Sequence, residues 1–198
     1  MKEEKPKKAT HKFDINKLER LERPERYAIY KPEELLVQAG LRAGMSCVDI
    51  GCGTGFYTGI ALNIVGKTGE VFALDIEDRM LDYTQHRNLD GNLHLLKSQE
   101  STFPLLDKKL DFAIMGLVLH EAIDPVSFLQ ETVRVLKDGG ILVGLEWKKK
   151  QEDKGPAVHE RIDLEETRKL LEDAGFKDIQ LDEWTDSHYV FKAIITKK

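Results

Sequence analysis

The sequence contains little cysteine and no long hydrophobic run. Its two cysteines, Cys47 and Cys52, form no C-x-x-C pair, so neither a disulfide framework nor a cysteine-based metal site is indicated. The longest apolar run, residues 112–119, is far shorter than the roughly 20 residues that span a membrane. Residues 1–8, MKEEKPKK, lack the apolar segment of a secretory signal. These absences predict a soluble, cytoplasmic protein without a membrane span or a bound metal.

An excess of positive charge is also absent. The chain has 30 Lys and Arg residues against 35 Asp and Glu residues, a formal net charge of −5. A broad electrostatic attraction to nucleic acid is therefore not expected. The length of 198 residues suits one domain. We expect residues 33–198 to form this domain and residues 1–32 to form a tail, lysine-rich over 1–12, followed by a lid or cap segment.

Three glycines lie between two mostly apolar segments. Gly51, Gly53 and Gly55 follow residues 45–50 and precede residues 56–65. The pattern predicts a strand, a tight turn and a helix, in which backbone N–H groups and a helix N-terminus bind a ligand. Glycine is needed in such a turn because a Cβ would obstruct the turn or the approach of the ligand.

An acidic residue ends the next expected strand. Residues 70–74 are mostly apolar, and Asp75 follows them. An acid in this place can accept hydrogen bonds from the hydroxyl groups of a ribose. Residues 45–77 therefore predict a nucleoside-binding site.

The residues around the glycines help to decide which nucleoside binds. A dinucleotide site has the pattern G-x-G-x-x-G, but Phe56 stands at its third glycine position, and no lysine follows as in a phosphate-binding P-loop. Asp49 precedes the first glycine by two residues. Its carboxylate would repel a pyrophosphate, whereas it suits a ligand with a cationic amino group or a sulfonium.

The order of the expected elements indicates an α/β fold. Strands are expected over residues 45–50, 70–74, 93–96, 111–115, 141–147, 179–184 and 189–195, and helices over 33–39, 56–65, 77–84, 125–136 and 164–174. Strands that alternate with helices predict a parallel sheet, and the two late strands predict a hairpin. The fold class is therefore a Rossmann-like three-layer sandwich with a mostly parallel seven-stranded sheet and a C-terminal antiparallel hairpin. Residues 24–32, with tyrosines between prolines, are expected to form a loop.

Several of these segments together resemble one known family. Residues 48–55, VDIGCGTG, resemble the first motif of the Rossmann-like (class I) S-adenosylmethionine-dependent methyltransferases, and residues 75–76 resemble the second. Residues 98–100 fall where the family contacts adenine. Residues 119–125 and 135–140 look like its late signatures. The resemblance identifies residues 33–198 as an S-adenosylmethionine-binding methyltransferase domain.

The resemblance implies S-adenosyl-L-methionine as methyl donor, S-adenosyl-L-homocysteine as product, and a set of cofactor-binding residues. This set is Asp49, Gly51, Cys52, Gly53, Gly55, Asp75, Ile76, Met80, Ser98, Gln99, Glu100, Gly116 and Leu117. After the fourth expected strand the sequence reads MGLV over residues 115–118, without the Asn-Pro-Pro-Tyr type of motif that holds the amines of nucleic-acid bases. The chain therefore resembles the small-molecule branch, which includes quinone-biosynthesis-like enzymes.

Other residues are candidates for catalysis or for binding the methyl acceptor. His120 is the best candidate for a general base, because it follows the fourth expected strand, whose carboxyl end lines the site. His120 could equally be a residue that begins a helix and bonds backbone or contacts the cofactor. Tyr27 and Tyr30 are either lid aromatics or packing residues. His159 is a weaker candidate for contact with the substrate.

Two readings from other functional classes stay open. One is a non-catalytic module that binds S-adenosylmethionine or S-adenosylhomocysteine. The other is a nicotinamide-dependent oxidoreductase, which Phe56 and the lack of room for a second substrate domain disfavour. The sequence does not identify the acceptor, so we expect only a small-molecule methyl acceptor.

Overall fold

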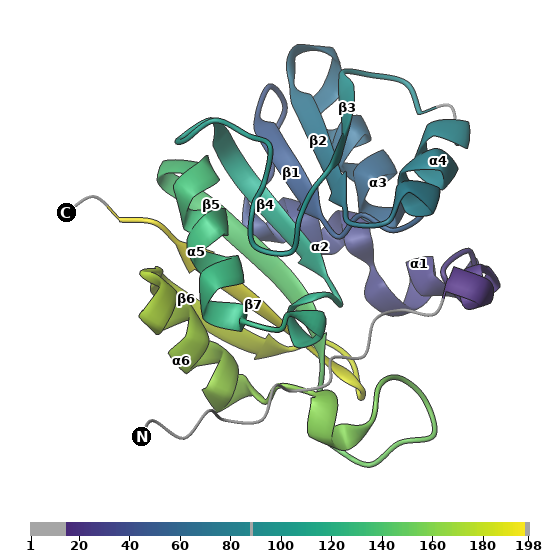
Figure 1. Ribbon diagram of the computed structural model, residues 1–198, viewed down its shortest axis with the longest axis vertical. Helices are drawn as coiled ribbons and strands as arrows, with labels where there is room; N and C mark the ends of the chain where they lie inside the picture. Colours follow the sequence, from purple (N-terminus) through teal and green to yellow (C-terminus); the bar gives the residue numbers. More distant parts are fainter. Residues whose placement is uncertain (1–14, 88, 197–198) are drawn as a thin grey trace, which may run out of the picture.

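Seven strands form one sheet in the order β3-β2-β1-β4-β5-β7-β6 (Figure 1). The computed structural model describes residues 15–87 and 89–196. The strands are β1 Ser46–Ile50, β2 Glu70–Asp75, β3 Leu93–Lys97, β4 Leu110–Gly116, β5 Leu136–Trp147, β6 Lys177–Glu183 and β7 His188–Ile194. Strands β1 to β5 pair in parallel, and β7 pairs antiparallel with both β5 and β6. The predicted fold class is confirmed.

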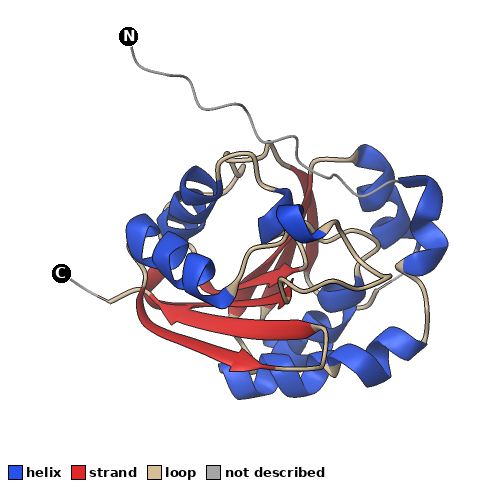
Figure 2. Cartoon of the chain, turned by 90° about the horizontal axis from the view of Figure 1, so that it is seen from below, coloured by secondary structure: helices blue, strands red, loops and turns tan. Residues whose placement is uncertain are grey.

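Helices cover both faces of the sheet (Figure 2). The α-helices are α1 Glu25–Tyr30, α2 Pro32–Ala39, α3 Phe56–Val65, α4 Asp78–His86, α5 Pro125–Val135 and α6 Leu164–Ala174, and the 3-10 helices are η1 Ile15–Arg20, η2 Gly66–Thr68, η3 Leu119–Glu121 and η4 Val158–Glu160. One buried cluster joins the sheet to α5 and α6, and a second joins it to α2 and α3. The two clusters are the two cores of a three-layer sandwich.

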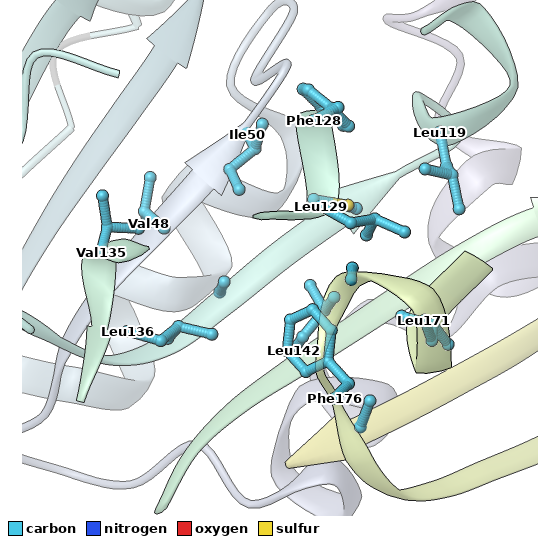
Figure 3. Packing of buried hydrophobic residues seen from close by; sticks show 14 of the residues in the cluster. Val48, Ile50, Leu119, Phe128, Leu129, Val135, Leu136, Leu142, Leu171 and Phe176 are labelled. Atoms are coloured by element: carbon cyan, nitrogen blue, oxygen red, sulfur yellow. The ribbon is translucent and has the colours of Figure 1, made fainter. Parts of the chain in front are cut away.

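The central strands are buried on both faces, as expected for a parallel sheet between two helical layers. Val48 and Ile50 of β1 face the α5–α6 layer, where they belong to the same cluster as Leu129 of α5 (Figure 3). Cys47 of β1 and Phe112 of β4 belong to the opposite cluster. Each of these side chains is at most 2% exposed, so the sheet holds its carboxyl edge rigidly.

Acidic residues cap both helices of the α5–α6 layer. The side chain of Asp124 accepts a hydrogen bond from Ser127 N at the start of α5, 3.1 Å long. Asp163 accepts one from Glu166 N at the start of α6, 2.8 Å long. These bonds satisfy N–H groups that have no partner inside the helix.

The expected loop over residues 24–32 is wrong, because most of it is α1. Pro24 occupies the position before the helix with φ −58°, a value that proline adopts without strain and that suits a helix start. Lys31 adopts a left-handed conformation, φ 42° and ψ 56°, which ends α1. Pro32 then begins α2, one residue before the expected helix. Each proline stands at the start of a helix, so the two prolines mark helix boundaries and not a loop.

The fifth strand begins earlier than expected. The sequence suggested a helix to residue 136 and a strand from residue 141, whereas β5 begins at Leu136. Leu136 pairs with Leu110, but the next pairing is Ile141 with Phe112. The residues between them form a bulge in which Gly139 has φ 80°. Such bulges are local features that hydrophobic periodicity does not reveal.

The lysine-rich segment 1–12 lies outside the described residues. Within residues 15–87 and 89–196, no helix has the length and apolar character required to cross a membrane. No cluster of three or more His, Cys, Asp or Glu side chains suited to a metal ion occurs in the same part of the chain. The cytoplasmic location stays a prediction.

Candidate active site

The loop after β1 depends on its three glycines. Gly51, Gly53 and Gly55 have φ angles of 69°, 54° and 82°, in the region that favours glycine. A Cβ on Gly51 would lie 2.7 Å from Val118 Cγ2, and a Cβ on Gly55 would lie 2.9 Å from Thr84 Cγ2. The loop is therefore packed closely between the end of β4 and α4.

The acid at the end of β2 is hydrogen-bonded to this loop. Asp75 Oδ2 accepts from Gly53 N at 2.9 Å, and Asp75 Oδ1 accepts from Glu77 N at 2.9 Å. Burial raises the pKa of Asp75, and the two backbone N–H groups partly offset that effect. Each oxygen keeps a further lone pair, so the carboxylate can still accept hydrogen bonds from a diol.

Asp49 lies beneath the loop and is only 1% exposed. Its Oδ2 accepts a hydrogen bond of 2.6 Å from Thr58 Oγ1. Burial raises the pKa of Asp49 to about 7, against the opposing effect of the Thr58 hydrogen bond. A buried carboxylate with one short hydrogen bond is unstable in its charged form unless a cation lies nearby.

The end of β4 lies beside the glycine loop. Gly116 lies against the ring of Tyr57, and a Cβ on Gly116 would collide with Tyr57 Cε2. Leu117 adopts φ 63° and donates its N–H to Leu145 O at 2.8 Å. A left-handed leucine is uncommon and carries strain. The chain therefore turns sharply where the sheet ends, next to the glycine loop.

Three further predicted cofactor residues lie in the glycine loop and after β3. Cys52 donates its N–H to Leu74 O at 2.8 Å, which ties the loop to β2. Ser98 N–H bonds Asp75 O at 3.0 Å, so the end of β3 lies beside the end of β2. Gln99 forms an isolated bridge with Thr102.

The last three members of the predicted set lie near the ends of β2 and β3. Glu100 Oε1 accepts a hydrogen bond from Ile123 N, which connects the segment after β3 with the segment before α5. Ile76 is half-buried next to Asp75, and Met80 is buried on α4. Hydrogen bonds thus join the carboxyl ends of β1, β2 and β3, and a further one links the segments after β3 and β4.

His120 is paired with a buried carboxylate. His120 Nδ1 lies 2.8 Å from Glu146 Oε2, and His120 N donates to Glu146 Oε1 at 3.2 Å. His120 and Glu146 are 4% and 1% exposed. Burial lowers the pKa of His120, but the charge and hydrogen bond of Glu146 outweigh burial, so the pKa lies above its ordinary value. Because Nδ1–H donates to Glu146, the neutral ring would present Nε2 as the proton acceptor.

The N-terminal helix covers the start of α3. The ring centroid of Tyr27 lies 4.8 Å from that of Phe56, and that of Tyr30 lies 6.2 Å from it. The Arg26 guanidinium lies 4.3 Å from the centre of the Phe56 ring. Trp184 Nε1 donates to Tyr30 O at 2.8 Å. Helix α1 is therefore fixed between the glycine loop and the C-terminal hairpin.

His159 lies apart from these residues in sequence and is exposed on η4. The charge of Glu160, the residue after His159, contributes slightly to the raised pKa of His120. Helix η4 therefore lies near the segment after β4. The structure leaves the role of His159 as a prediction.

Sequence reasoning missed Arg161, which is 1% exposed and organises the segment after β5. Its guanidinium donates to the backbone oxygens of Lys148, Lys150, Lys154 and Pro156, with lengths between 2.6 and 3.1 Å. A buried arginine with this many carbonyl acceptors fixes a loop that has no regular structure. Its position after a charged, irregular stretch gave no signal in the sequence.

Sequence reasoning also missed the importance of three buried polar groups without a hydrogen-bond partner. Within the described residues these are Thr54 Oγ1, Tyr57 OH and His188 Nε2. Thr54 belongs to the glycine loop, Tyr57 contacts Gly116, and His188 pairs with the end of β5. Buried polar atoms rarely stay unpaired. Their positions around the same edge of the sheet are consistent with ligand groups that complete the bonding.

Two hollows of about 500 Å³ lie elsewhere on the molecule. The first is lined by Ser46, Glu70 and Leu93, at the starts of β1, β2 and β3. In open α/β sheets ligands bind outside the carboxyl ends of the strands. The residues described above lie at the carboxyl ends of the strands, opposite these hollows, where α1 covers the glycine loop. The candidate site is therefore at this edge.

A Rossmann-like sheet with a glycine loop after β1 and an acid after β2 defines the class of nucleoside-binding α/β proteins. Residues 48–144 match a family described as methyltransferase domain. The chain is 35% identical to a SAM dependent methyltransferase from Aquifex aeolicus, with a TM-score of 0.88, covering 93% of this chain and 100% of that one. The chain therefore belongs to the S-adenosylmethionine-dependent methyltransferases, whose cofactor is S-adenosylmethionine.

Two further likenesses concern part of the sequence and the fold. The chain is 32% identical over 123 residues to a demethylmenaquinone methyltransferase from Staphylococcus aureus (strain MRSA252), covering 62% of this chain and 51% of the relative. The chain thus spans about half the length of that relative. It also shares its fold with the [4+2]-cyclase SpnF, with a TM-score of 0.73 at 18% identity, covering 86% of this chain and 82% of that one.

Proposed function

We propose that this protein transfers the methyl group of S-adenosylmethionine to a small-molecule acceptor. The observation that carries the proposal is the hydrogen bond from Gly53 N to Asp75 Oδ2. It places a carboxylate that can bind ribose hydroxyls against the loop whose backbone can bind the amino-acid part of the cofactor.

The residues of the site fit this cofactor. Asp75 would hold the ribose, and Asp49 would balance the positive charge of the ligand. Unpaired Thr54 Oγ1 and Tyr57 OH offer hydrogen bonds near the glycine loop. Gly116 has no side chain, and any other residue there would collide with the ring of Tyr57.

The edge of β2 and β3 suits the adenine ring. Ile76 and Met80 would supply apolar contact, and residues 98–100 would supply polar contact. Gly51, Cys52, Gly53, Gly55 and Leu117 would contribute backbone surface to the same site. Each of these roles is part of the proposal, and variants of single residues test them.

The sulfonium of the bound cofactor supplies a methyl group that is already strongly electrophilic. The protein then has to orient the acceptor in line with the methyl group and exclude water, effects worth up to about 7–11 kcal/mol in well-aligned systems. Burial of Asp49, Tyr57 and His120 at 1%, 5% and 4% exposure supports a site from which water is excluded.

His120 would act as general base for an acceptor that carries a proton at neutral pH. Its Nε2 would take the proton that the acceptor loses as the nucleophilic atom bonds to the methyl carbon and the methyl–sulfur bond breaks. Glu146 would hold the imidazolium that forms. A positioned base of this kind contributes about 10²–10⁴-fold to the rate.

The segment 18–31 would act as a lid over the cofactor. Leu21 Cδ1 lies 3.7 Å from the position of a Cβ on Gly53, and Tyr27 and Tyr30 pack on Phe56. The lid must open to admit a ligand, because in its present position it covers the glycine loop. This role corresponds to the predicted cap within residues 1–32.

A quinol is the acceptor that the sequence relatives suggest first. The experiment supplies labelled S-adenosylmethionine and reduced 1,4-naphthoquinone, a ring whose carbon is nucleophilic and whose proton must leave on methylation. We expect enzyme-dependent transfer of label into the extracted ring, with loss of transfer in Gly53→Val. No transfer to the quinol or to components of a cell extract would contradict the proposal.

Cofactor binding and methyl transfer have to be measured separately, because a binding module and an enzyme would both bind S-adenosylhomocysteine. Protein that binds S-adenosylhomocysteine but methylates nothing in these assays would support the non-catalytic binding module instead.

A further inference from the structure

A row of aromatic rings runs from the glycine loop to the end of β5. The ring centroids of Phe56 and Tyr30 are 6.2 Å apart, those of Tyr30 and His188 are 5.1 Å apart, and those of His188 and Trp147 are 4.2 Å apart. We call these four residues the aromatic row. Phe56 directly follows the glycine loop, and Trp147 directly follows Glu146. The row therefore connects the proposed cofactor site with the carboxylate that holds His120.

His188 is the polar member of the aromatic row and lacks a partner for one ring nitrogen. The side chain is 3% exposed, and among residues 15–87 and 89–196 Nε2 has no hydrogen-bond partner. An unpaired buried polar group destabilises the folded protein. A protein core that needed only packing at this position could avoid that cost with phenylalanine, so the nitrogen points to a ligand.

The hydrogen bonds around Thr185 fix which nitrogen of His188 carries the proton. Thr185 Oγ1 accepts from Ser187 N at 3.2 Å and from His188 N at 3.0 Å. Both lone pairs of the hydroxyl are then used, so its proton points to His188 Nδ1, 2.9 Å away. Nδ1 is therefore an acceptor, and the neutral ring carries its proton on Nε2.

The ring of His188 is neutral near pH 7, chiefly because burial lowers its pKa to about 4. The carboxylates whose charges oppose this shift are Glu152 and Glu146. Glu152 lies 3.4 Å from Arg161 Nη1, and Glu146 holds His120. These two carboxylates are thus already bonded, one to Arg161 and the other to His120. Such surroundings suit an uncharged ligand better than an ammonium ion.

We propose that His188 binds the methyl acceptor, by donating a hydrogen bond from Nε2 to a carbonyl or hydroxyl oxygen of an uncharged, planar molecule that packs beside the aromatic row. This proposal rests on the proposed methyltransferase function and names a residue that sets acceptor specificity. Tyr30 and Trp147 supply the aromatic surface, which favours a flat ring over an aliphatic chain. Because Tyr30 lies on α1, it belongs to both the lid and the proposed acceptor site.

The test uses 1,4-naphthoquinone, which carries two carbonyl oxygens, added to protein saturated with S-adenosylhomocysteine. The chain has two tryptophans; Trp147 belongs to the row and Trp184 donates to Tyr30 O, so tryptophan fluorescence reports on this site. His188→Phe keeps the ring but removes the donor, whereas His188→Gln keeps an N–H near the same place. NMR of the imidazole nitrogens of the wild type reads the tautomer without any variant.

We expect saturable binding of naphthoquinone, weakened about 10- to 100-fold in His188→Phe, as for an oxygen left unpaired, and within about threefold of the wild type in His188→Gln. S-adenosylhomocysteine affinity stays unchanged in both variants, and benzylamine, a cation at pH 7, does not compete. Equal naphthoquinone affinity in His188→Phe, no saturable binding to the wild type, or a proton on Nδ1 would overturn the proposal. Failure of S-adenosylhomocysteine to bind the wild type would instead overturn the proposed function.

Discussion

Asp75 Oδ2 accepts a hydrogen bond from Gly53 N at 2.9 Å, so the end of β2 and the loop after β1 form one rigid corner. The same carboxylate accepts from Glu77 N through its other oxygen. The two hydrogen bonds fix the carboxylate, which reduces the ordering that binding must cost. The following predictions concern this corner and the groups around it.

Replacement of Asp75 by alanine removes the proposed acceptor of the ribose hydroxyls and the anchor of Gly53. We expect S-adenosylhomocysteine to bind about 10- to 100-fold more weakly, because a hydrogen bond to a charged group contributes about 1.5–3 kcal/mol. Isothermal titration calorimetry measures this change. Asp82→Asn, an exposed acid on α4, serves as control and should bind as the wild type does. Wild-type affinity in Asp75→Ala would mean that the ribose binds elsewhere.

The pKa of Asp49, raised by burial to about 7, makes ligand affinity depend on pH. Below pH 7 the carboxyl is mostly neutral and cannot balance a cation, so affinity for S-adenosylhomocysteine should rise about tenfold between pH 6 and pH 8. Asp49→Asn should bind weakly and lose most of this dependence. A wild-type affinity that is flat across this range would contradict a charge-balancing role for Asp49.

Without ligand, Asp49 should affect stability in the opposite direction. A group whose pKa is raised in the folded state stabilises that state below its unfolded pKa, and loses the contribution as the pH rises through the folded pKa. The free energy of unfolding should thus decline as the pH rises from about 4 toward 7, relative to Asp49→Asn. Urea unfolding of both proteins across this range measures the difference. A variant that follows the wild type at every pH would show that Asp49 does not titrate in this window.

The pair of His120 and Glu146 predicts the pH dependence of catalysis. A base must be neutral to accept a proton, and the pKa of His120 lies above its ordinary value because of Glu146. Turnover of the naphthoquinol should therefore rise with pH through that raised pKa. Glu146→Gln removes the charge and should move the rise to lower pH, while His120→Ala should lower kcat about 10²–10⁴-fold. Unchanged turnover in His120→Ala, with cofactor binding intact, would leave His120 a structural residue.

The hydrogen bond of 2.8 Å from Trp184 Nε1 to Tyr30 O holds α1 in place. Trp184→Phe should destabilise this attachment by about 0.5–1.5 kcal/mol and speed cleavage by trypsin after Arg20, Arg23 or Arg26. S-adenosylhomocysteine should slow the cleavage in the wild type if segment 18–31 closes over it. Tyr83→Phe, on exposed α4 surface, is the control. Cleavage that is insensitive to the ligand would argue against the lid.

Much of the fold could be predicted because its signals are local. The apolar run before Gly51, the acid of β2 and the caps at Asp124 and Asp163 are each readable over a few residues. The two errors, the missed helix α1 and the late start assigned to β5, have a common origin. A short helix between prolines and a bulge at Gly139 are fixed by tertiary packing, which outweighs propensity over so few residues.

The candidate site was predictable in part for a similar reason. The glycine loop and Asp75 are motif residues with fixed spacing. The partners that give other side chains their chemistry are distant in the chain: Glu146 beside His120, Trp147 beside His188, and the backbone oxygens around Arg161. Such pairings depend on sheet register, and a single sequence gives register only after the strands are placed.

The central claim is that the glycine loop binds S-adenosylmethionine and its product, and calorimetry with S-adenosylhomocysteine tests it most directly. We predict one-site binding to the wild type, and loss of binding in Gly53→Val, whose side chain the left-handed loop at φ 54° cannot accommodate without strain. Gly139→Val is the matched control, because Gly139 has φ 80° but lies in the β5 bulge with open space around it; it should lose stability and keep binding. Absence of binding at millimolar ligand in folded wild-type protein, or wild-type affinity in Gly53→Val, would contradict the claim.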